Sequence, residues 1–136
     1  MKNFLKNLTA EHDFCHGFKE SIAEPGGRER LKDAIKNNPP VIHPVIRTHP
    51  ITKRKAIFVN PLFTTKINEL SKSESDALLE FLYSYSITPE FTCRFSWTPN
   101  SIAIWDNRCT LHKPINDYFP EHRLLERITV DGDEPF

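Results

Sequence analysis

The sequence has 136 residues, 38% hydrophobic and 26% charged, which fits one globular domain and excludes a disordered chain. Eighteen acidic residues balance eighteen basic residues, so nothing in the net charge favours nucleic acid or an anionic membrane as a partner. No apolar run approaches the roughly 20 residues of a membrane-spanning helix, and the first residues lack a signal-peptide core. We therefore expect a cytoplasmic protein.

The cysteines indicate free thiols. Cys15, Cys93 and Cys109 are odd in number and form no C-x-x-C pair. A disulfide framework is therefore not expected, and neither is a zinc site, because no pair has the spacing of a metal finger.

Short elements are predicted for the first 60 residues. Residues 3–10 place Phe4, Leu5 and Leu8 on one helical face. After the break E-P-G-G at 24–27, residues 28–37 predict a short helix that ends at Asn38-Pro39-Pro40. Two β-like runs at 41–48 and 55–60 then flank a six-residue loop, which is the layout of a hairpin.

The clearest helix begins at Ser71 or Ser73. Ser71 and Glu74 have the S-x-x-E spacing of a capping box, in which each side chain binds a free backbone N–H of the first turn. Leu78, Leu79, Phe81 and Leu82 give the helix an apolar face that predicts packing against a core.

The rest of the chain has the pattern of strands. Residues 91–97 alternate apolar and polar side chains, and further strands are predicted at 101–105 and from 123 to about 130. Short strands joined by Pro- and Asn-rich turns predict an antiparallel sandwich or roll. The predicted fold class is mainly β with flanking helices (α+β).

Two arginines stand out in the last predicted strand. Arg123 and Arg127 are four residues apart, so they point to the same face of a strand. Guanidinium groups among apolar residues require an acid or a bound anion, and their planar fork suits carboxylate or sulfonate. The alternative is an edge strand with solvated arginines, which the spacing alone favours.

A set of collinear motifs carries a family resemblance. The run W-D-N-R-x-x-x-H at 105–112 is followed by D-Y-x-P at 117–120 and R-x-x-x-R at 123–127. Upstream lie A-E-H-D-F at 10–14, N-P-P-V-I-H-P-V-I-R-T-H-P at 38–50 and F-V-N-P-L-F-T-T at 58–65. Over nearly the whole chain the sequence resembles the taurine dioxygenase and 2,4-D dioxygenase family, whose members depend on iron(II) and 2-oxoglutarate.

The resemblance implies a fold and a set of site residues. Residues 1–136 would be a single partial domain, the C-terminal half of a double-stranded β-helix, or jelly roll. His112 would be one of three iron ligands, in a facial triad of two histidines and one carboxylate. Arg123 would bind 2-oxoglutarate, and Arg127 would bind the substrate sulfonate. Phe14 and Phe63 fall at aromatic positions that line the substrate pocket.

The chemistry implied by the resemblance is oxidative. With O2 and 2-oxoglutarate as co-substrates, a small sulfonate such as taurine would be hydroxylated, giving sulfite, aldehyde, succinate and CO2. The expected partner is thus a small anion, with no nucleic acid or membrane, and family members often form homo-oligomers. An alkyl sulfate or an aryloxyacetate is the alternative substrate, because Arg127 would hold those anions as well. Trp105 is expected to pack near the metal.

One family motif is absent, the H-x-D/E pair that supplies the other two iron ligands. None of the six histidines has an acidic residue two positions later. We therefore expect a fragment that is inactive alone, with a non-catalytic degenerate remnant or interaction module as the rival hypothesis. The oxygenase hypothesis requires His112, Arg123 and Arg127 to converge on one cavity.

The other histidines have plainer interpretations. His12 beside Asp13 could form an acid–base pair, although a structural histidine is favoured. His43 and His49 flank prolines and are expected to be structural, whereas Arg47, among apolar residues, could meet a carboxylate.

Overall fold

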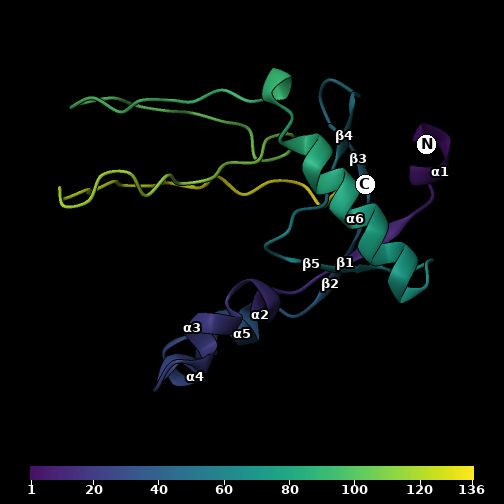
Figure 1. Cartoon of the computed structure of the whole chain (residues 1–136), viewed down its shortest axis with the longest axis horizontal. Coiled ribbons are helices and arrows are strands. Elements are labelled where there is room, and N and C mark those ends of the chain that lie inside the picture. Colours follow the sequence, from purple (N-terminus) through teal and green to yellow (C-terminus); the bar gives the residue numbers. More distant parts are fainter.

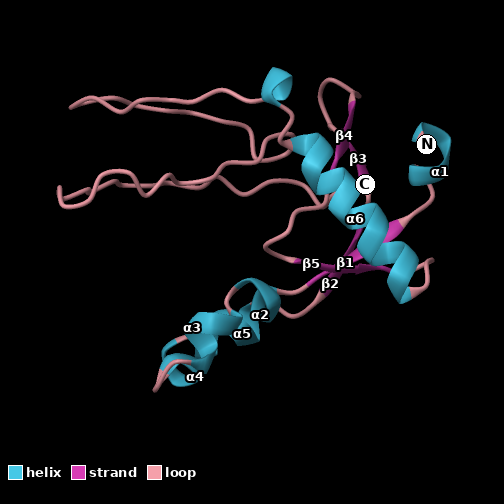
Figure 2. Ribbon diagram, viewed as in Figure 1, coloured by secondary structure: helices cyan, strands magenta, loops and turns pink.

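A computed structural model describes residues 1–136 and shows helices and antiparallel strands confined to the first 91 residues (Figures 1 and 2). The elements in chain order are α1 (Lys2–Leu5), β1 (Thr9–His12), α2 (Phe14–Gly17), α3 (Lys19–Ala23), α4 (Gly27–Arg30), α5 (Lys32–Asn37), β2 (Val41–Pro44), β3 (Ile46–Thr48), β4 (Lys55–Ile57), β5 (Thr64–Ile67), α6 (Lys72–Ser86) and the 3-10 helix Pro89–Phe91. This confirms an α+β chain with antiparallel sheets, but helices contain more residues than strands. The prediction of a mainly β structure is therefore wrong for these residues.

β1 is the central strand of a three-stranded antiparallel sheet, in the order β2-β1-β5. Ala10 pairs with His43 on one side and with Ile67 on the other, and its side chain is fully buried. The helix predicted for residues 3–10 ends at Leu5. That prediction is wrong for the second half because β1 satisfies its backbone groups on two neighbouring strands.

β3 and β4 form a separate antiparallel hairpin, with Arg47 opposite Ala56. The predicted hairpin is confirmed in this part. Its first predicted strand, residues 41–48, divides instead into two, because β2 pairs with β1 and only β3 pairs with β4.

α6 covers the sheet and closes the main core. Its capping box of Ser71 and Glu74 is present as predicted, with the Ser71 N–H donating to Glu74 Oε2 at 2.9 Å. Ser75, 1% exposed, accepts a hydrogen bond from the Ile67 N–H at 2.8 Å and so ties the helix to β5. The buried apolar residues of this core are Leu5, Leu8, Ala10, Val45, Val59, Ile67, Leu79 and Leu82. Neither α6 nor any other helix combines the length and apolar character required to cross a membrane.

The four short helices α2 to α5 form a lobe beside the sheet (Figure 1). The helix predicted at 28–37 is confirmed in location but interrupted at Leu31, where α4 ends and α5 begins. Gly26 precedes α4 with φ of 74°, a left-handed conformation that glycine adopts without steric penalty.

Residues 92–136 contain no helix or strand and run as two long extended arms (Figures 1 and 2). The first arm turns back at residues 99–100 and the second arm at residues 119–120. The strands predicted at 91–97, 101–105 and 123–130 are therefore not formed. A strand requires neighbours for its N–H and C=O groups, and these segments find none within the chain. Apolar side chains here remain in solvent, with Ile104 and Ile128 each 94% exposed.

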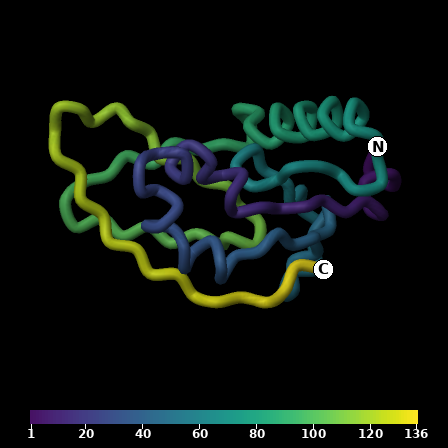
Figure 3. Tube along the Cα trace, turned by 90° about the horizontal axis from the view of Figure 1, so that it is seen from below, coloured from purple at the N-terminus to yellow at the C-terminus, as the bar shows by residue number.

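The chain end returns to the sheets (Figure 3). The Thr48 N–H donates to the Phe136 carbonyl oxygen at 2.7 Å, and Arg47 Nη2 donates to the Asp133 carbonyl oxygen at 3.3 Å. The last residues are thereby held against β3, although the arm that leads to them is exposed.

Candidate functional site

His112 lies on an exposed part of the second arm, against the ring of Trp105. The two ring centroids are 4.9 Å apart, with an interplanar angle of 48°. The indole N–H of Trp105 donates to Asn107 Oδ1 at 2.9 Å. The structure thus places Trp105 beside His112, and the expected packing of Trp105 near a metal stays a prediction.

Between these two rings the chain forms a compact turn around Asp106. One carboxylate oxygen, Oδ1, accepts from the backbone N–H and the Nε–H of Arg108, both at 2.9 Å. The other, Oδ2, accepts from Arg108 Nη2 at 2.7 Å. The Arg108 guanidinium, followed by a hydrogen bond from His49, holds the pKa of Asp106 well below its ordinary range. Asp106 is therefore an anion throughout the physiological range.

His49 joins this turn to the β3–β4 hairpin. Its Nε2 lies 3.0 Å from Asp106 Oδ2, across 57 residues of sequence, and its side chain is buried. Its Nδ1 accepts backbone N–H groups from Ile51 at 3.2 Å and Thr52 at 3.1 Å. His49 was expected to be structural. Its contact with Asp106 was not predicted, because nothing in the R-T-H-P and W-D-N-R motifs indicates that they lie side by side.

The same place holds the one group of potential metal ligands in the structure. Ligand atoms of His49, Asp106 and Cys109 lie within 4.8 Å of one another. Because Nδ1 of His49 accepts two N–H bonds, the ring proton resides on Nε2, the atom that would have to bind the ion. Asp106 is also occupied by Arg108. These donors do not fit a metal, and His112 has no second ligand beside it.

Arg123 and Arg127 are exposed on the second arm. The guanidinium carbon of Arg123 lies 5.6 Å from the centroid of the Tyr118 ring, in a cation–π contact. Neither arginine forms an ion pair with an acid of the chain. All three residues, His112 included, are exposed and none lines either of the two main hollows, so the expected common cavity is not found there and their roles stay predictions.

The two predicted pocket aromatics, Phe14 and Phe63, are half-buried and share a neighbour. Phe18 stacks on Phe14 with centroids 4.4 Å apart and lies 6.2 Å from Phe63. Gly17 permits this approach, because a Cβ there would lie 2.8 Å from both the Leu62 carbonyl oxygen and the Phe63 ring. The structure brings these aromatics together, on elements separate from the arms.

A buried polar cluster, formed by His12, His43 and Arg47 around the ring of Phe58, was not predicted as a unit. The imidazole centroids are 5.2 Å apart, and the guanidinium carbon of Arg47 lies 5.0 Å from the Phe58 centroid. Burial, and then the charge of His43, lowers the pKa of His12 to about 4. Burial also lowers the pKa of His43, against the opposing effect of Glu134.

Within this cluster, His12 Nε2, His43 Nδ1 and Arg47 Nε have no hydrogen-bond partner. The acid–base pair of His12 with Asp13 is wrong, because Asp13 caps α2 by accepting from the Cys15 N–H at 2.8 Å. Register across β1 and β2 brings the histidines together, which local sequence does not show.

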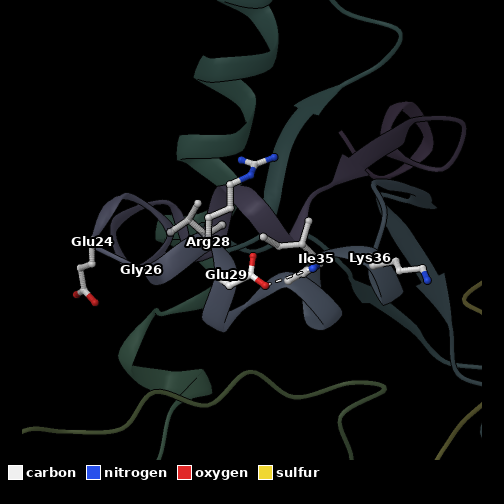
Figure 4. A pocket seen from close by; sticks show the side chains of 8 residues that line it. Glu24, Gly26, Arg28, Glu29, Ile35 and Lys36 are labelled. Carbon is white, nitrogen blue, oxygen red and sulfur yellow. Dashed lines mark hydrogen bonds and ion pairs between the residues drawn. The ribbon is translucent and has the colours of Figure 1, made fainter.

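The hollows of the surface lie elsewhere. One of about 570 Å³ opens among the short helices and is lined by both acidic and basic residues, among them Glu24, Arg28, Glu29 and Lys36 (Figure 4). A second, of about 310 Å³, lies between α6 and β5. Neither includes His112, Arg123 or Arg127.

Comparison with known proteins gives a consistent result. The family model described as "Taurine catabolism dioxygenase TauD, TfdA family" matches residues 1–129. An alpha-ketoglutarate-dependent sulfonate dioxygenase of Saccharomyces cerevisiae is 36% identical over 99% of this chain and 32% of its own length. An alkylsulfatase of Acinetobacter baylyi is 34% identical over 98% of this chain and 43% of its own length.

A solved structure is consistent with the same family. A Burkholderia xenovorans protein assigned to the alpha-ketoglutarate-dependent taurine dioxygenases superposes with a TM-score of 0.61 at 34% identity, covering 79% of this chain and 31% of that one. The chain thus spans about a third of the length of the sulfonate dioxygenase and of this structure.

Proposed function

The chain belongs to the taurine catabolism dioxygenase TauD, TfdA family, and from this premise we propose that it forms the C-terminal half of an iron(II)- and 2-oxoglutarate-dependent dioxygenase. Its substrate would be a small sulfonate such as taurine. Members of this family combine 2-oxoglutarate with O2 in oxidising a second substrate, so the expected products are succinate, CO2, an aldehyde and sulfite.

One observation carries the proposal: the unbroken order of W-D-N-R-x-x-x-H and R-x-x-x-R in a chain that matches the family model over residues 1–129. The residue types suit the reactants. Imidazole is a ligand for iron, and the guanidinium fork binds a carboxylate or a sulfonate through two parallel hydrogen bonds. Arg123 and Arg127 have no acidic partner in the chain, so both are available for anions.

The residues of the chain supply one iron ligand, His112, and do not form a complete site by themselves. We infer that the two arms complete the jelly roll only alongside further strands that the present 136 residues do not include. The exposed apolar side chains of residues 92–136 support this, since Ile102, Ile104 and Ile128 are each more than four-fifths exposed. Such strands would satisfy the backbone groups of the arms and orient Arg123 and Arg127 to one face.

A sulfate ester is the second candidate substrate. The Acinetobacter baylyi alkylsulfatase and a Pseudomonas putida sulfate ester dioxygenase are 34% and 36% identical to this chain. Sulfonate and sulfate ester both present a tetrahedral sulfur with three terminal oxygens that share one negative charge, which Arg127 would bind alike. The products differ. Hydroxylation of the carbon bonded to sulfur leads to C–S cleavage and releases sulfite from a sulfonate, whereas hydroxylation of the carbon bonded to the ester oxygen leads to C–O cleavage and releases sulfate from an ester.

The test is a substrate panel on the complete reading frame that contains this chain. Taurine, an alkyl sulfate and an aryloxyacetate are supplied with iron(II), 2-oxoglutarate and O2, and succinate, sulfite and sulfate are measured. Replacement of Arg127 by Met is expected to raise KM for the sulfonate while leaving KM for 2-oxoglutarate unchanged. Arg28→Met, at an exposed arginine of α4, is the matched control. Release of sulfate from the alkyl sulfate, with no sulfite from taurine, would show that the substrate is a sulfate ester and not a sulfonate.

The exposure of His112, Arg123 and Arg127 favours a second function, a non-catalytic remnant. Iron titration of the complete reading frame separates the two hypotheses, and the same titration of the 136-residue chain tests how many ligands this chain supplies. Tight stoichiometric binding by this chain alone would contradict the inference that it supplies a single ligand. No iron binding by the complete reading frame, with no succinate formed, would establish the remnant.

A further inference from the structure

We propose that His49 is a positioning residue, which fixes the turn that presents His112 by donating its Nε2–H to Asp106. The proposal rests on the proposed function for the role of His112, whereas the contact itself is a property of the fold. It gives the other residues of the W-D-N-R-x-x-x-H motif a role, which is to hold His112 in position.

The direction of the hydrogen bond follows from the other ring nitrogen. Nδ1 of His49 accepts the backbone N–H groups of Ile51 and Thr52, so it cannot carry a proton itself. The tautomer that satisfies both sides of the ring carries its proton on Nε2, 3.0 Å from Asp106 Oδ2.

The anchor is buried, whereas the arm is exposed. His49 is 8% exposed and stands at the end of β3, whereas residues 109–130 are exposed throughout. Among the side-chain hydrogen bonds, His49 to Asp106 is the one that ties residues 98–112 to the strands. A buried donor to a carboxylate is among the stronger hydrogen bonds available to a protein.

Asp106 connects His49 to the residues that precede His112. Its carbonyl oxygen accepts from the Cys109 N–H at 3.2 Å and from the Thr110 N–H at 3.1 Å, which closes a single tight turn. The Thr110 hydroxyl donates to the same oxygen at 2.6 Å. His112 follows two residues later, with Trp105 from the other side of the turn against its ring.

Arg108 completes the arrangement. It engages both oxygens of Asp106 and so fixes the rotation of the carboxylate toward His49. The motif letters W, D and R then have separate tasks: Trp105 contacts the ring of His112, Asp106 forms the turn, and Arg108 orients Asp106. His49 attaches the assembly to the hairpin.

The test measures the position of the His112 ring directly. Proton and carbon spectra of the 136-residue chain labelled at histidine are recorded at neutral pH, with His112 assigned from His112→Gln. We expect the His112 ring protons to be displaced from free-imidazole positions by the Trp105 ring current. We also expect long-range nitrogen correlations that place the His49 proton on Nε2. A His49 proton on Nδ1 alone, which leaves Nε2 without a hydrogen to donate, would overturn the proposal.

Three variants then separate positioning from general stability. His49→Leu and Asp106→Ala are expected to abolish the displacement of the His112 signals. His49→Gln, whose amide N–H reaches the place of Nε2, is expected to retain it. His122→Gln, at an exposed histidine of the same arm, is the matched control. Unchanged amide signals of Ala10 and Val45 show that the core persists in each variant.

The outcomes are distinct from those of the function test. If Asp106→Ala leaves the His112 displacement intact while the core signals persist, the positioning role is refuted. If the displacement responds as expected but the complete reading frame binds no iron, His49 still orients His112 and the proposed function alone fails.

Discussion

Replacement of His12 by Phe should remove the contribution of this buried histidine to the acid sensitivity of the fold. His12 is 9% exposed, between the rings of His43 and Phe58, and its Nε2 has no partner. Burial lowers its pKa from 6.5 to about 4. Between these two pH values, His12 is therefore protonated in the unfolded chain and neutral in the folded chain.

The sign and size follow from that window. Stability is full above pH 6.5, falls as the pH drops toward 4, and then levels off, because both states are protonated below the folded pKa. A pH of 5 is about 1.5 units below the pKa of His12 in the unfolded chain, so the unfolded side chain is protonated, while the folded one is still neutral. At roughly 1.4 kcal/mol per unit, the loss between pH 7.5 and pH 5 is about 2 kcal/mol.

Urea unfolding at the two pH values measures this loss. The wild type should lose about 2 kcal/mol more than His12→Phe on acidification, whereas His122→Gln, at an exposed histidine, should behave as the wild type. An equal loss in wild type and His12→Phe would show that His12 is not held neutral by burial, and the description of the buried polar cluster would then be wrong.

Three further changes test the core and the aromatic contact, each by urea unfolding. Leu82→Ala removes a side chain that is 1% exposed and should cost about 2–5 kcal/mol; a smaller loss would mean that α6 is not docked. Ser75→Ala leaves the Ile67 N–H buried without an acceptor and should cost about 1–3 kcal/mol, against a negligible effect for Ser73→Ala on the exposed face. Gly17→Ala should destabilise by about 1–3 kcal/mol because its Cβ meets backbone and ring atoms at 2.8 Å, while Gly132→Ala, with nothing within 4 Å, should be neutral.

The elements that the sequence predicted well are those stabilised by their own neighbours in the chain. The capping box at Ser71 and Glu74 acts within one turn, and the β3–β4 hairpin closes over a six-residue loop. Residues 9 and 10 were predicted to be helical because the pattern of Leu5 and Leu8 was extended too far. Their strand conformation depends on partners more than 30 residues away.

The candidate site divides in the same way. Motif order was sufficient to identify the family and to place Trp105 near His112. The pair of His49 and Asp106 was missed because nothing local to either residue signals a contact across 57 positions. The strands predicted for residues 91–130 have the right alternation, but alternation specifies only which face is buried. It cannot supply the neighbouring strand on which hydrogen bonding depends.

The central claim is that His112 is an iron ligand of a 2-oxoglutarate-dependent dioxygenase. The most direct measurement is succinate and sulfite release from taurine by the complete reading frame, compared with its His112→Ala variant under the same iron supply. The account predicts equal amounts of the two products from the wild type and neither from the variant. Equal product release by both proteins would contradict it.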